Sequence, residues 1–256
     1  MADSVTRTFK VIEYLANSND WVSLRDMSRD LHIGGASAYR VLNSLKNIGY
    51  VRQDPQDSKY QLTLRIAWVS AQVLEHVQLR QIAHPVLQHL TSVTNETTHL
   101  AVLEGTEFVY IDKVDNTQAV RMRSRVGQRG LLYCTAAGKS ILAFMPHDDL
   151  EGILGRLTLR SLTEHTITDL QGFREQLALI RRSGYSVDDE ENEVGIRCIG
   201  APIYDHAGRL VGALSISGWT ITMTRERIPV LVPGLLEACR QVSQELGYRS
   251  APPAAK

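Results

Sequence analysis

Residues 34–53 read GGASAYRVLNSLKNIGYVRQ, and they determine the fold of the first part of the chain. The apolar residues of this stretch recur at steps of three and four, which is the period of an amphipathic helix. Gly49 follows the last periodic position and is expected to cap the end of the helix. The residues expected on the inner face are Ala38, Val41, Leu42, Leu45 and Ile48.

The outer face of this helix is polar and carries no carboxylate. Between residues 33 and 52 the cations are Arg40, Lys46 and Arg52, and no acid occurs. Guanidinium, carboxamide and hydroxyl groups are able to read base edges or hold phosphates in a DNA major groove. A polar helix face is more often simply solvated, so the prediction of DNA binding depends on the elements around it. The face consists of Ser37, Arg40, Asn43, Ser44 and Asn47.

Two helices are expected before this stretch and a hairpin after it. The first ends in the turn at residues 17–20, and the second begins at Ser23, with Asp26 three residues on as in a capping box. Residues 50–53 and 59–62 alternate around a polar turn. Three helices and a hairpin predict a winged helix-turn-helix domain over residues 1–62. The apolar stripes are expected to be Val5, Phe9, Ile12 and Ala16 in the first helix and Leu24, Met27 and Leu31 in the second.

The charge of the whole chain hides this local pattern. Of 256 residues, 28 are Lys or Arg and 28 are Asp or Glu, so the formal net charge is zero. Neutrality argues on its own against a polyanionic partner. Because the positive charge gathers on one helix and the hairpin, we expect a sequence-specific, dimer-dependent DNA reader with weak non-specific binding.

Cysteine usage and hydropathy indicate the compartment. Cys134, Cys198 and Cys239 stand far apart without a CxxC pair, which favours a reducing cytoplasm over a disulfide scaffold. The N-terminal residues show no secretion signal, and no run of about 18 apolar residues occurs, so no membrane partner is expected. The histidines lack metal-binding spacing, and neither a metal nor a cofactor is predicted.

A connecting helix is expected over residues 63–81, because the apolar residues from Leu62 to Val77 again recur at steps of three and four. Trp68 and Leu74 lie off this stripe and require burial, which favours packing on a partner copy. The alternative is that this helix is the first core helix of the next domain.

Residues 82–248 are expected to form an α+β domain with room for a pocket, and residues 249–256 a frayed tail. Helices are predicted from about residue 82, from Ala136, over 148–157 and 169–183, and at the end of the domain, where it carries Ile228, Leu231, Leu235, Val242 and Leu246. Strands are predicted at 99–103, 107–114, 119–124, 196–204 and 210–217.

Several catalytic motifs are present only in part. Residues 138–140 read GKS, but a phosphate loop requires glycine where Tyr133 stands. Cys198 has no histidine beside it in sequence, and Ser215 and Ser217 lack the GxSxG pattern, so nucleophilic catalysis is unsupported unless partners meet in space. The acidic run at 188–193 is either a solvated loop or places one acid at a pocket mouth to position ligand hydroxyls.

From Val5 to about Tyr248 the chain resembles the IclR family of bacterial transcriptional regulators. The resemblance is carried by Ala38-Tyr39-Arg40 with Gly49-Tyr50-Val51, and by residues 133–139, 184–203 and 213–218. It implies a GAF-like effector domain, and a homodimer or dimer of dimers that binds a small carboxylate metabolite and changes its hold on operator DNA.

The resemblance also implies which residues bind. For DNA they are Ser37, Tyr39, Arg40, Asn43, Ser44, Asn47, Arg52 and Lys59. For the effector they are Met122, Leu132, Ala136, Ala137, Asp188, Cys198, Ser215 and Ser217. Amides at the helix start near Ala136 suit a carboxylate, and Ser215 and Ser217 share one face of a strand.

Two details refine the expectation. The string at 121–125, RMRSR, with Gly127 and Arg129, resembles the branch that responds to sugar acids such as 2-keto-3-deoxygluconate. Residues 34–36, Gly-Gly-Ala, stand where many relatives have Ser-Lys-Ser, which removes a hydroxyl cap and a phosphate-contacting lysine. Either fewer phosphates are contacted, or the hairpin supplies the contacts through Arg52 and Lys59.

The expected function is a repressor of a sugar-acid catabolic operon that its ligand relieves. The alternatives are a transcriptional activator of the same type, a hydrolase using Cys198 or Ser215, and a DNA-binding structural protein without a ligand.

Overall fold

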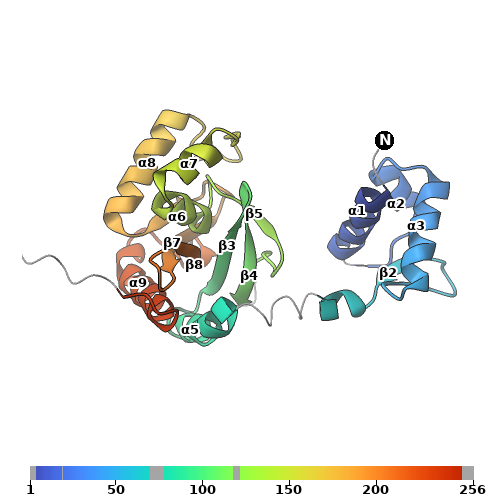
Figure 1. The fold of residues 1–256 in the computed structure, drawn as a ribbon, viewed down its shortest axis with the longest axis horizontal. Coiled ribbons are helices and arrows are strands. Elements are labelled where there is room, and N and C mark those ends of the chain that lie inside the picture. Colours follow the sequence, from blue (N-terminus) through green and yellow to red (C-terminus); the bar gives the residue numbers. More distant parts are fainter. Residues whose placement is uncertain (1–3, 19, 70–77, 118–121, 250–256) are drawn as a thin grey trace, which may run out of the picture. The chain divides into compact units, whose positions relative to one another are not determined.

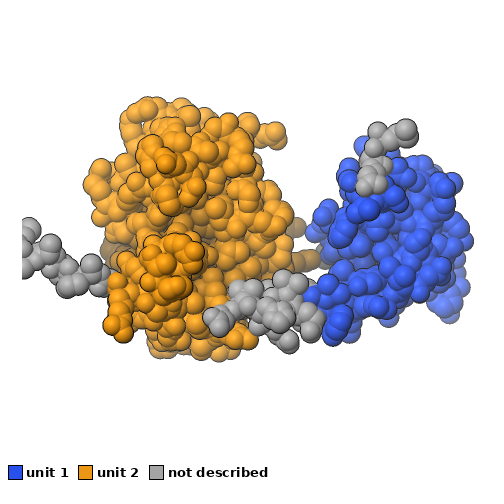
Figure 2. Space-filling model, in the orientation of Figure 1, with its two compact units in different colours: residues 1–76 blue, residues 77–256 orange. Residues whose placement is uncertain are grey.

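The computed structural model describes residues 4–18, 20–69, 78–117 and 122–249. The chain divides into two compact units, unit 1 at residues 1–76 and unit 2 at residues 77–256 (Figure 2). Each unit has a hydrophobic core of its own, which is the requirement for a separate domain.

Unit 1 is a winged helix-turn-helix, as predicted. Helices α1 (Ser4–Asn17), α2 (Leu24–Asp30) and α3 (Gly35–Asn47) precede an antiparallel hairpin of β1 (Val51–Gln53) and β2 (Tyr60–Leu62) (Figure 1). Val22 forms a bridge to Tyr60, which ties the turn before α2 to the hairpin.

The helix ends follow the expected signals. The Ser23 hydroxyl accepts a hydrogen bond from the Asp26 amide at 3.1 Å and caps α2. At the end of α3, Gly49 has φ +82°, a left-handed conformation that glycine adopts without strain, and Tyr50 N–H donates to the Leu45 carbonyl at 2.9 Å. Gly34 stands at the start of α3 and gives no side-chain cap.

Two predicted inner faces in unit 1 were wrong in part. In α1 the buried residues are Val11 and Leu15, whereas Val5 and Phe9 are 59% and 58% exposed. The sequence of α1 contains two adjacent apolar stripes. The core is built on the stripe of Val11 and Leu15, and the stripe of Val5 and Phe9 lies at the surface. Ile48 is 53% exposed because it lies at the cap of α3, where the chain leaves the core.

The predicted connecting helix is described only at its two ends. Residues 65–69 are helical, and Trp68 among them is 63% exposed. Leu74 lies outside the described residues. Residues 78–81 belong to α5 (Gln78–Thr94), which packs in the core of unit 2.

Unit 2 is an α+β domain built on a six-stranded antiparallel sheet with the order β5-β4-β3-β8-β7-β6. The strands are β3 (Thr97–Glu104), β4 (Glu107–Val114), β5 (Arg129–Leu131), β6 (Ser186–Asp189), β7 (Ile196–Tyr204) and β8 (Leu210–Trp219). Of the strand predicted at 119–124, residues 122–124 are not extended in the sheet, and the others lie outside the described residues. The three-residue strand β5 is too short to produce an alternating signal and was not predicted.

Helices cover both faces of the sheet (Figure 1). On one face lie α5 and α9 (Ile228–Glu245), and on the other lie α6 (Ala136–Phe144), α7 (His147–Leu154) and α8 (Leu170–Ser183). Alternation along β8 sends Leu214 and Ile216 into the core beneath α5 and α9. The intervening residues Ser215 and Ser217 therefore face the α6 side, where the candidate site lies.

Candidate functional site

The central cavity of unit 2 has a volume of about 200 Å³ and lies between the sheet, the start of α6 and the loop after β6. Seven of the eight residues expected to bind an effector line it together. The exception is Leu132, which is fully buried in the core beneath α6 and α7 instead of lining the cavity. The seven residues are Met122, Ala136, Ala137, Asp188, Cys198, Ser215 and Ser217.

The sheet supplies the polar floor of the central cavity. Ser215 pairs with His99 across β8 and β3, and Ser217 pairs with Cys198 across β8 and β7. The two serines share one face of β8, as their alternation predicted, and they are buried, 2% and 3% exposed. This floor therefore presents hydroxyl groups and an imidazole from largely buried side chains.

His99 is a neutral hydrogen-bonding group. Burial, with a smaller effect from the Lys113 charge, lowers the pKa of His99 to about 3. Its Nε2 lies 2.7 Å from the Ser124 hydroxyl and its Nδ1 lies 3.5 Å from the Ser217 hydroxyl. A neutral imidazole offers one donor and one acceptor, which suits a ligand hydroxyl better than a carboxylate.

The start of α6 forms another wall. Thr135 caps the helix by accepting a hydrogen bond from the Gly138 amide at 3.2 Å. Ala136 and Ala137 occupy the first turn, where amide groups have no partner within the helix and the helix dipole is positive. The wall sits close to β7 because residue 200 is glycine, and a Cβ atom there would lie 2.8 Å from the Ala136 carbonyl carbon.

Asp188 is the acid at this cavity. It is 2% exposed, and its Oδ1 accepts hydrogen bonds from the amides of Glu191 at 2.9 Å and Asn192 at 3.3 Å. Burial raises the pKa of Asp188 to about 7, while the Lys139 charge acts in the opposite direction. At neutral pH both protonation states are therefore populated, and the carboxyl group is able to donate to or accept from a ligand hydroxyl.

Lys139 holds the loop that carries these amides. Its ammonium is fully buried and donates to the Glu191 carboxylate and to the Val187 carbonyl. Thr166 Oγ1 donates a hydrogen bond to the Glu191 carbonyl at 2.6 Å, which is a second contact that holds the same loop. Because Lys139 is buried and paired, the GKS string is not a phosphate loop, as expected from Tyr133.

Several lining residues were not predicted from the sequence. His99 and Tyr110 come from β3 and β4, and only strand pairing brings them beside Ser215 and Ser217. Asn192 lies within the acidic run, and its position shortly after β6 gave no separate signal. Residues 123 and 124 lie within the basic string that was assigned to the sugar-acid branch, and both line the central cavity.

The described residues show neither an activated thiol nor a metal site. Burial raises the pKa of Cys198 well above its usual value and that of Cys134 to about 12, so both thiols stay protonated at neutral pH. Among the described residues, no group of three or more His, Cys, Asp or Glu side chains is placed to hold a metal ion.

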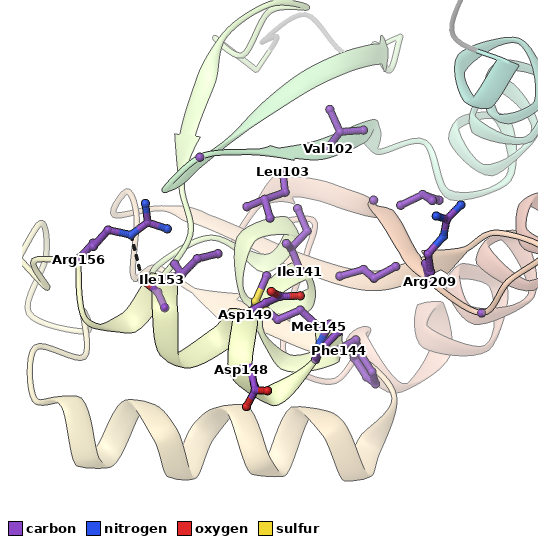
Figure 3. A pocket seen from close by; sticks show the side chains of 17 residues that line it. Val102, Leu103, Ile141, Phe144, Met145, Asp148, Asp149, Ile153, Arg156 and Arg209 are labelled. Atoms are coloured by element: carbon purple, nitrogen blue, oxygen red, sulfur yellow. Dashed lines mark hydrogen bonds between the residues drawn. The ribbon is translucent and has the colours of Figure 1, made fainter.

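A larger cavity of about 870 Å³ lies elsewhere in unit 2, between the ends of β3 and β8 and the helices α6 and α7. Figure 3 shows Val102 and Leu103 of the sheet on one side and Asp148 of α7 on the other. None of its described lining residues is a buried polar side chain. The charged Arg209 at its edge is paired with Asp205 at 2.7 Å, so the central cavity is the better binding site for a polar molecule.

The recognition face predicted in unit 1 lies on the surface. Arg40, Asn43, Ser44 and Asn47 are exposed on α3, and Tyr39 is 49% exposed beside them. Ser37 is half-buried and its hydroxyl accepts a hydrogen bond from Arg7 Nη1 at 2.5 Å.

The basic residues of the hairpin are partly engaged. Arg52 Nη2 donates to Gln61 Oε1 at 2.7 Å, and its guanidinium lies 5.0 Å from the centre of the Trp21 ring. Lys59 forms an ion pair with Asp57 at 3.3 Å. Both cations remain at the surface, where exposed pairs are weak and are easily exchanged for a phosphate.

None of the described helices combines the length and the apolar character that crossing a bilayer requires.

Comparison with known proteins identifies the family. The family profile described as "Bacterial transcriptional regulator IclR C-terminal" matches residues 71–244, and that described as "IclR helix-turn-helix domain" matches residues 4–55. The HTH-type transcriptional regulator KdgR of Escherichia coli (strain K12) is 35% identical over 249 residues, which span 97% of this chain and 94% of that protein. The transcriptional repressor IclR of the same strain is 30% identical over 246 residues, 95% of this chain and 90% of that protein.

Solved structures agree. The Thermotoga maritima IclR superimposes with a TM-score of 0.81 at 36% identity, covering 96% of this chain and 99% of that chain. The C-terminal domain of the E. coli regulator KdgR superimposes with a TM-score of 0.61 at 36% identity, covering 66% of this chain and 99% of that domain. The chain therefore belongs to the IclR family of DNA-binding bacterial transcriptional regulators.

Proposed function

We propose that the protein represses a sugar-acid catabolic operon and that a small carboxylate metabolite in the central cavity relieves this repression. The observation that carries the proposal is the convergence of seven expected effector residues on one buried, polar cavity. The identity of 34–35% to two KdgR regulators and the basic string at 121–129 support the sugar-acid type of ligand.

The chemistry of the cavity supports a hydroxylated acid. Arg123 and the first amides of α6 supply positive charge for a carboxylate. His99, Asp188 and the two floor serines supply neutral donors and acceptors for hydroxyl groups. A volume of about 200 Å³ suits a small metabolite and is below the usual range of sites for drug-sized molecules.

In this proposal, metabolite binding and DNA binding are thermodynamically linked. A metabolite that binds one arrangement of the protein more tightly shifts the population toward that arrangement by its difference in affinity. We further propose a homodimer or a dimer of dimers, in which ligand binding changes the spacing of two recognition helices on two operator half-sites. Apolar side chains at the surface of unit 1 support a partner copy: Leu64 is 87% exposed and Trp68 is 63% exposed. The working compartment is the cytoplasm, where the operator is.

A thermal-shift screen tests the ligand. The full-length protein is heated with a panel of sugar acids and keto acids that includes 2-keto-3-deoxygluconate. A ligand at 100 times its Kd stabilises the folded state by about 2.7 kcal/mol, so the Tm of the wild-type protein rises measurably. Ser217→Ala removes a floor hydroxyl and should reduce this rise, whereas Ser92→Ala, at an exposed serine of α5, should not. If no acid of the panel shifts the wild-type Tm, the ligand class is wrong.

A gel-shift measurement tests the DNA-binding face. Arg40→Ala should weaken binding to the promoter fragment of the regulated operon and leave the thermal response to the metabolite unchanged. An unchanged gel shift would remove Arg40 from the recognition face.

A further inference from the structure

A notch of about 250 Å³ lies within unit 1, between the first two turns of α1 and the outer side of α3. It combines two guanidinium groups with four hydroxyl groups, and none of its seven lining residues is an acid. These residues are Ser4, Arg7, Thr8, Ser37, Arg40, Val41 and Ser44.

The hydrogen bonds inside the notch are compatible with an anion. Arg7 Nη1 donates to Ser37 Oγ at 2.5 Å, so the proton of the Ser37 hydroxyl remains for another acceptor. A guanidinium carries five N–H groups, so a single arginine is able to serve more than one acceptor at the same time. Thr8 and Ser44 direct their hydroxyl protons to backbone carbonyls at 2.9 Å and 3.0 Å and act as walls. The donors of the notch are therefore the two arginines and the hydroxyl groups of Ser4 and Ser37.

We propose that this notch binds one phosphate of the operator backbone, with Arg7 of α1 and Arg40 of α3 on the phosphate oxygens. The inference rests on the DNA-binding function of the family and extends it to Arg7, a residue of α1 outside the predicted recognition face. A planar guanidinium matches a phosphate in a bidentate geometry. When a recognition helix lies in the major groove, the phosphate backbone runs along its sides, and the notch is lined by the outer side of α3 together with α1.

The notch accounts for the departure at the start of α3. Gly34 and Gly35 offer neither a side-chain cap nor a cation, and a Cβ atom at either would meet nothing within 4 Å. The start of α3 therefore exposes its backbone and carries no cation. Arg7 places a positive charge beside the first turn of α3 from the neighbouring helix, through its bond to Ser37.

The salt dependence of DNA affinity tests this assignment. A duplex selected from a random-sequence pool by the wild-type full-length protein is the probe, and Kd is measured by fluorescence anisotropy between about 50 and 200 mM salt. Loss of one phosphate contact lowers the slope of log K against log salt by about one in magnitude. We expect this change for Arg7→Gln, equally on the selected duplex and on an unrelated duplex, because a phosphate contact carries no sequence information.

Three matched variants distinguish a phosphate contact in the notch from a packing role of Arg7 and from an effect of overall charge. Arg7→Lys keeps the charge and should keep the slope. Lys10→Gln removes an exposed charge from the same helix outside the notch and should change the slope less than Arg7→Gln. Ser37→Ala removes the partner of Arg7 together with a hydroxyl of the notch, so only its Tm is used, as a measure of what the Arg7–Ser37 bond contributes to stability.

Two results would overturn the proposal. One is an Arg7→Gln variant that keeps the wild-type salt slope while its Tm falls as far as that of Ser37→Ala, because Arg7 would then only hold α1 to α3. The other is an equal loss of slope in Lys10→Gln, since the effect would then be one of overall charge.

Discussion

Lys139 on α6 and Glu191 in the loop after β6 form an ion pair in which the two side chains are 0% and 7% exposed. The pair links the helix whose first turn lines the central cavity to the loop whose amides bind Asp188. Two walls of the candidate effector site are thereby held in one geometry. A ligand that requires both walls depends on this pair without contacting it.

Removing one partner of the pair should destabilise unit 2. Lys139→Met leaves Glu191 as an unpaired buried carboxylate, and breaking a buried pair in this way costs about 3–5 kcal/mol. Urea denaturation of the full-length protein measures the loss. The double variant Lys139→Met/Glu191→Gln carries no unpaired charge and should recover a large part of it. If the double variant is as unstable as the single one, charge pairing is not what Lys139 contributes.

The raised pKa of Asp188 predicts a pH dependence of stability. A carboxyl group whose pKa is raised to about 7 by burial contributes stability at acid pH that is lost as the pH rises from about 4 through 7. The loss approaches about 1.4 kcal/mol per pH unit in that window. The side chain of the variant Asp188→Asn keeps an oxygen that accepts hydrogen bonds from the two loop amides, and this side chain cannot ionise.

The Asp188 prediction is measured as the difference in Tm between variant and wild type at pH 5 and pH 8. We expect the Tm of Asp188→Asn minus the Tm of the wild type to be several degrees larger at pH 8 than at pH 5. The difference cancels the contribution of His99, whose pKa is lowered and whose effect has the opposite sign. An equal difference at the two pH values would show that Asp188 is ionised in the folded protein across this range.

Two helical glycines should respond differently to alanine. At Gly138 of α6 a Cβ atom would lie 2.5 Å from the Leu132 Cα atom, so the backbone must shift and Gly138→Ala should cost about 1–3 kcal/mol. At Gly152 of α7 nothing lies within 4 Å, and alanine should stabilise by up to about 1 kcal/mol through helix propensity. Thermal unfolding of both variants checks the contrast, and similar Tm values would contradict the close packing at Gly138.

The inner face of α3 is tested by a second pair. Leu45 is 3% exposed in the core of unit 1, and Leu45→Ala should cost about 2–5 kcal/mol. Ile48 is 53% exposed, and Ile48→Ala should change the free energy of unfolding by less than about 0.5 kcal/mol. If Ile48→Ala strongly lowers the free energy of unfolding of the protein without DNA, Ile48 packs in the core, as the sequence predicted.

Much of the fold could be predicted because its signals are local. Ser23 and Gly49 mark helix ends, and the hairpin of unit 1 follows from alternation around a polar turn. The stripe of α1 could not be predicted from periodicity alone, because Val11 with Leu15 and Phe9 with Ile12 both fit a helical period. Tertiary packing chose between them.

The family resemblance implied the residues of the candidate site, and the sequence pattern supports them where they follow one another along single elements. Ser215 and Ser217 alternate on one strand, and Ala136 and Ala137 start one helix. His99 was missed because its neighbour Ser215 is far away in the sequence and strand order brings them together. Leu132 packs into the core and is not among the residues that line the cavity, and an apolar residue just before α6 fits a cavity wall and a core equally well in sequence.

The proposed function requires that occupation of the central cavity in unit 2 controls DNA binding by unit 1. The direct measurement is the fluorescence anisotropy of a labelled duplex, selected by the wild-type protein, with and without 2-keto-3-deoxygluconate or the acid that the thermal-shift screen identifies. We predict that the acid weakens DNA binding by the wild-type protein at least tenfold, a coupling of about 1.4 kcal/mol. Asp188→Ala should bind the same duplex and respond much less to the acid. An acid that binds the protein and leaves the affinity of the wild type for DNA unchanged would contradict this control of DNA binding by the cavity.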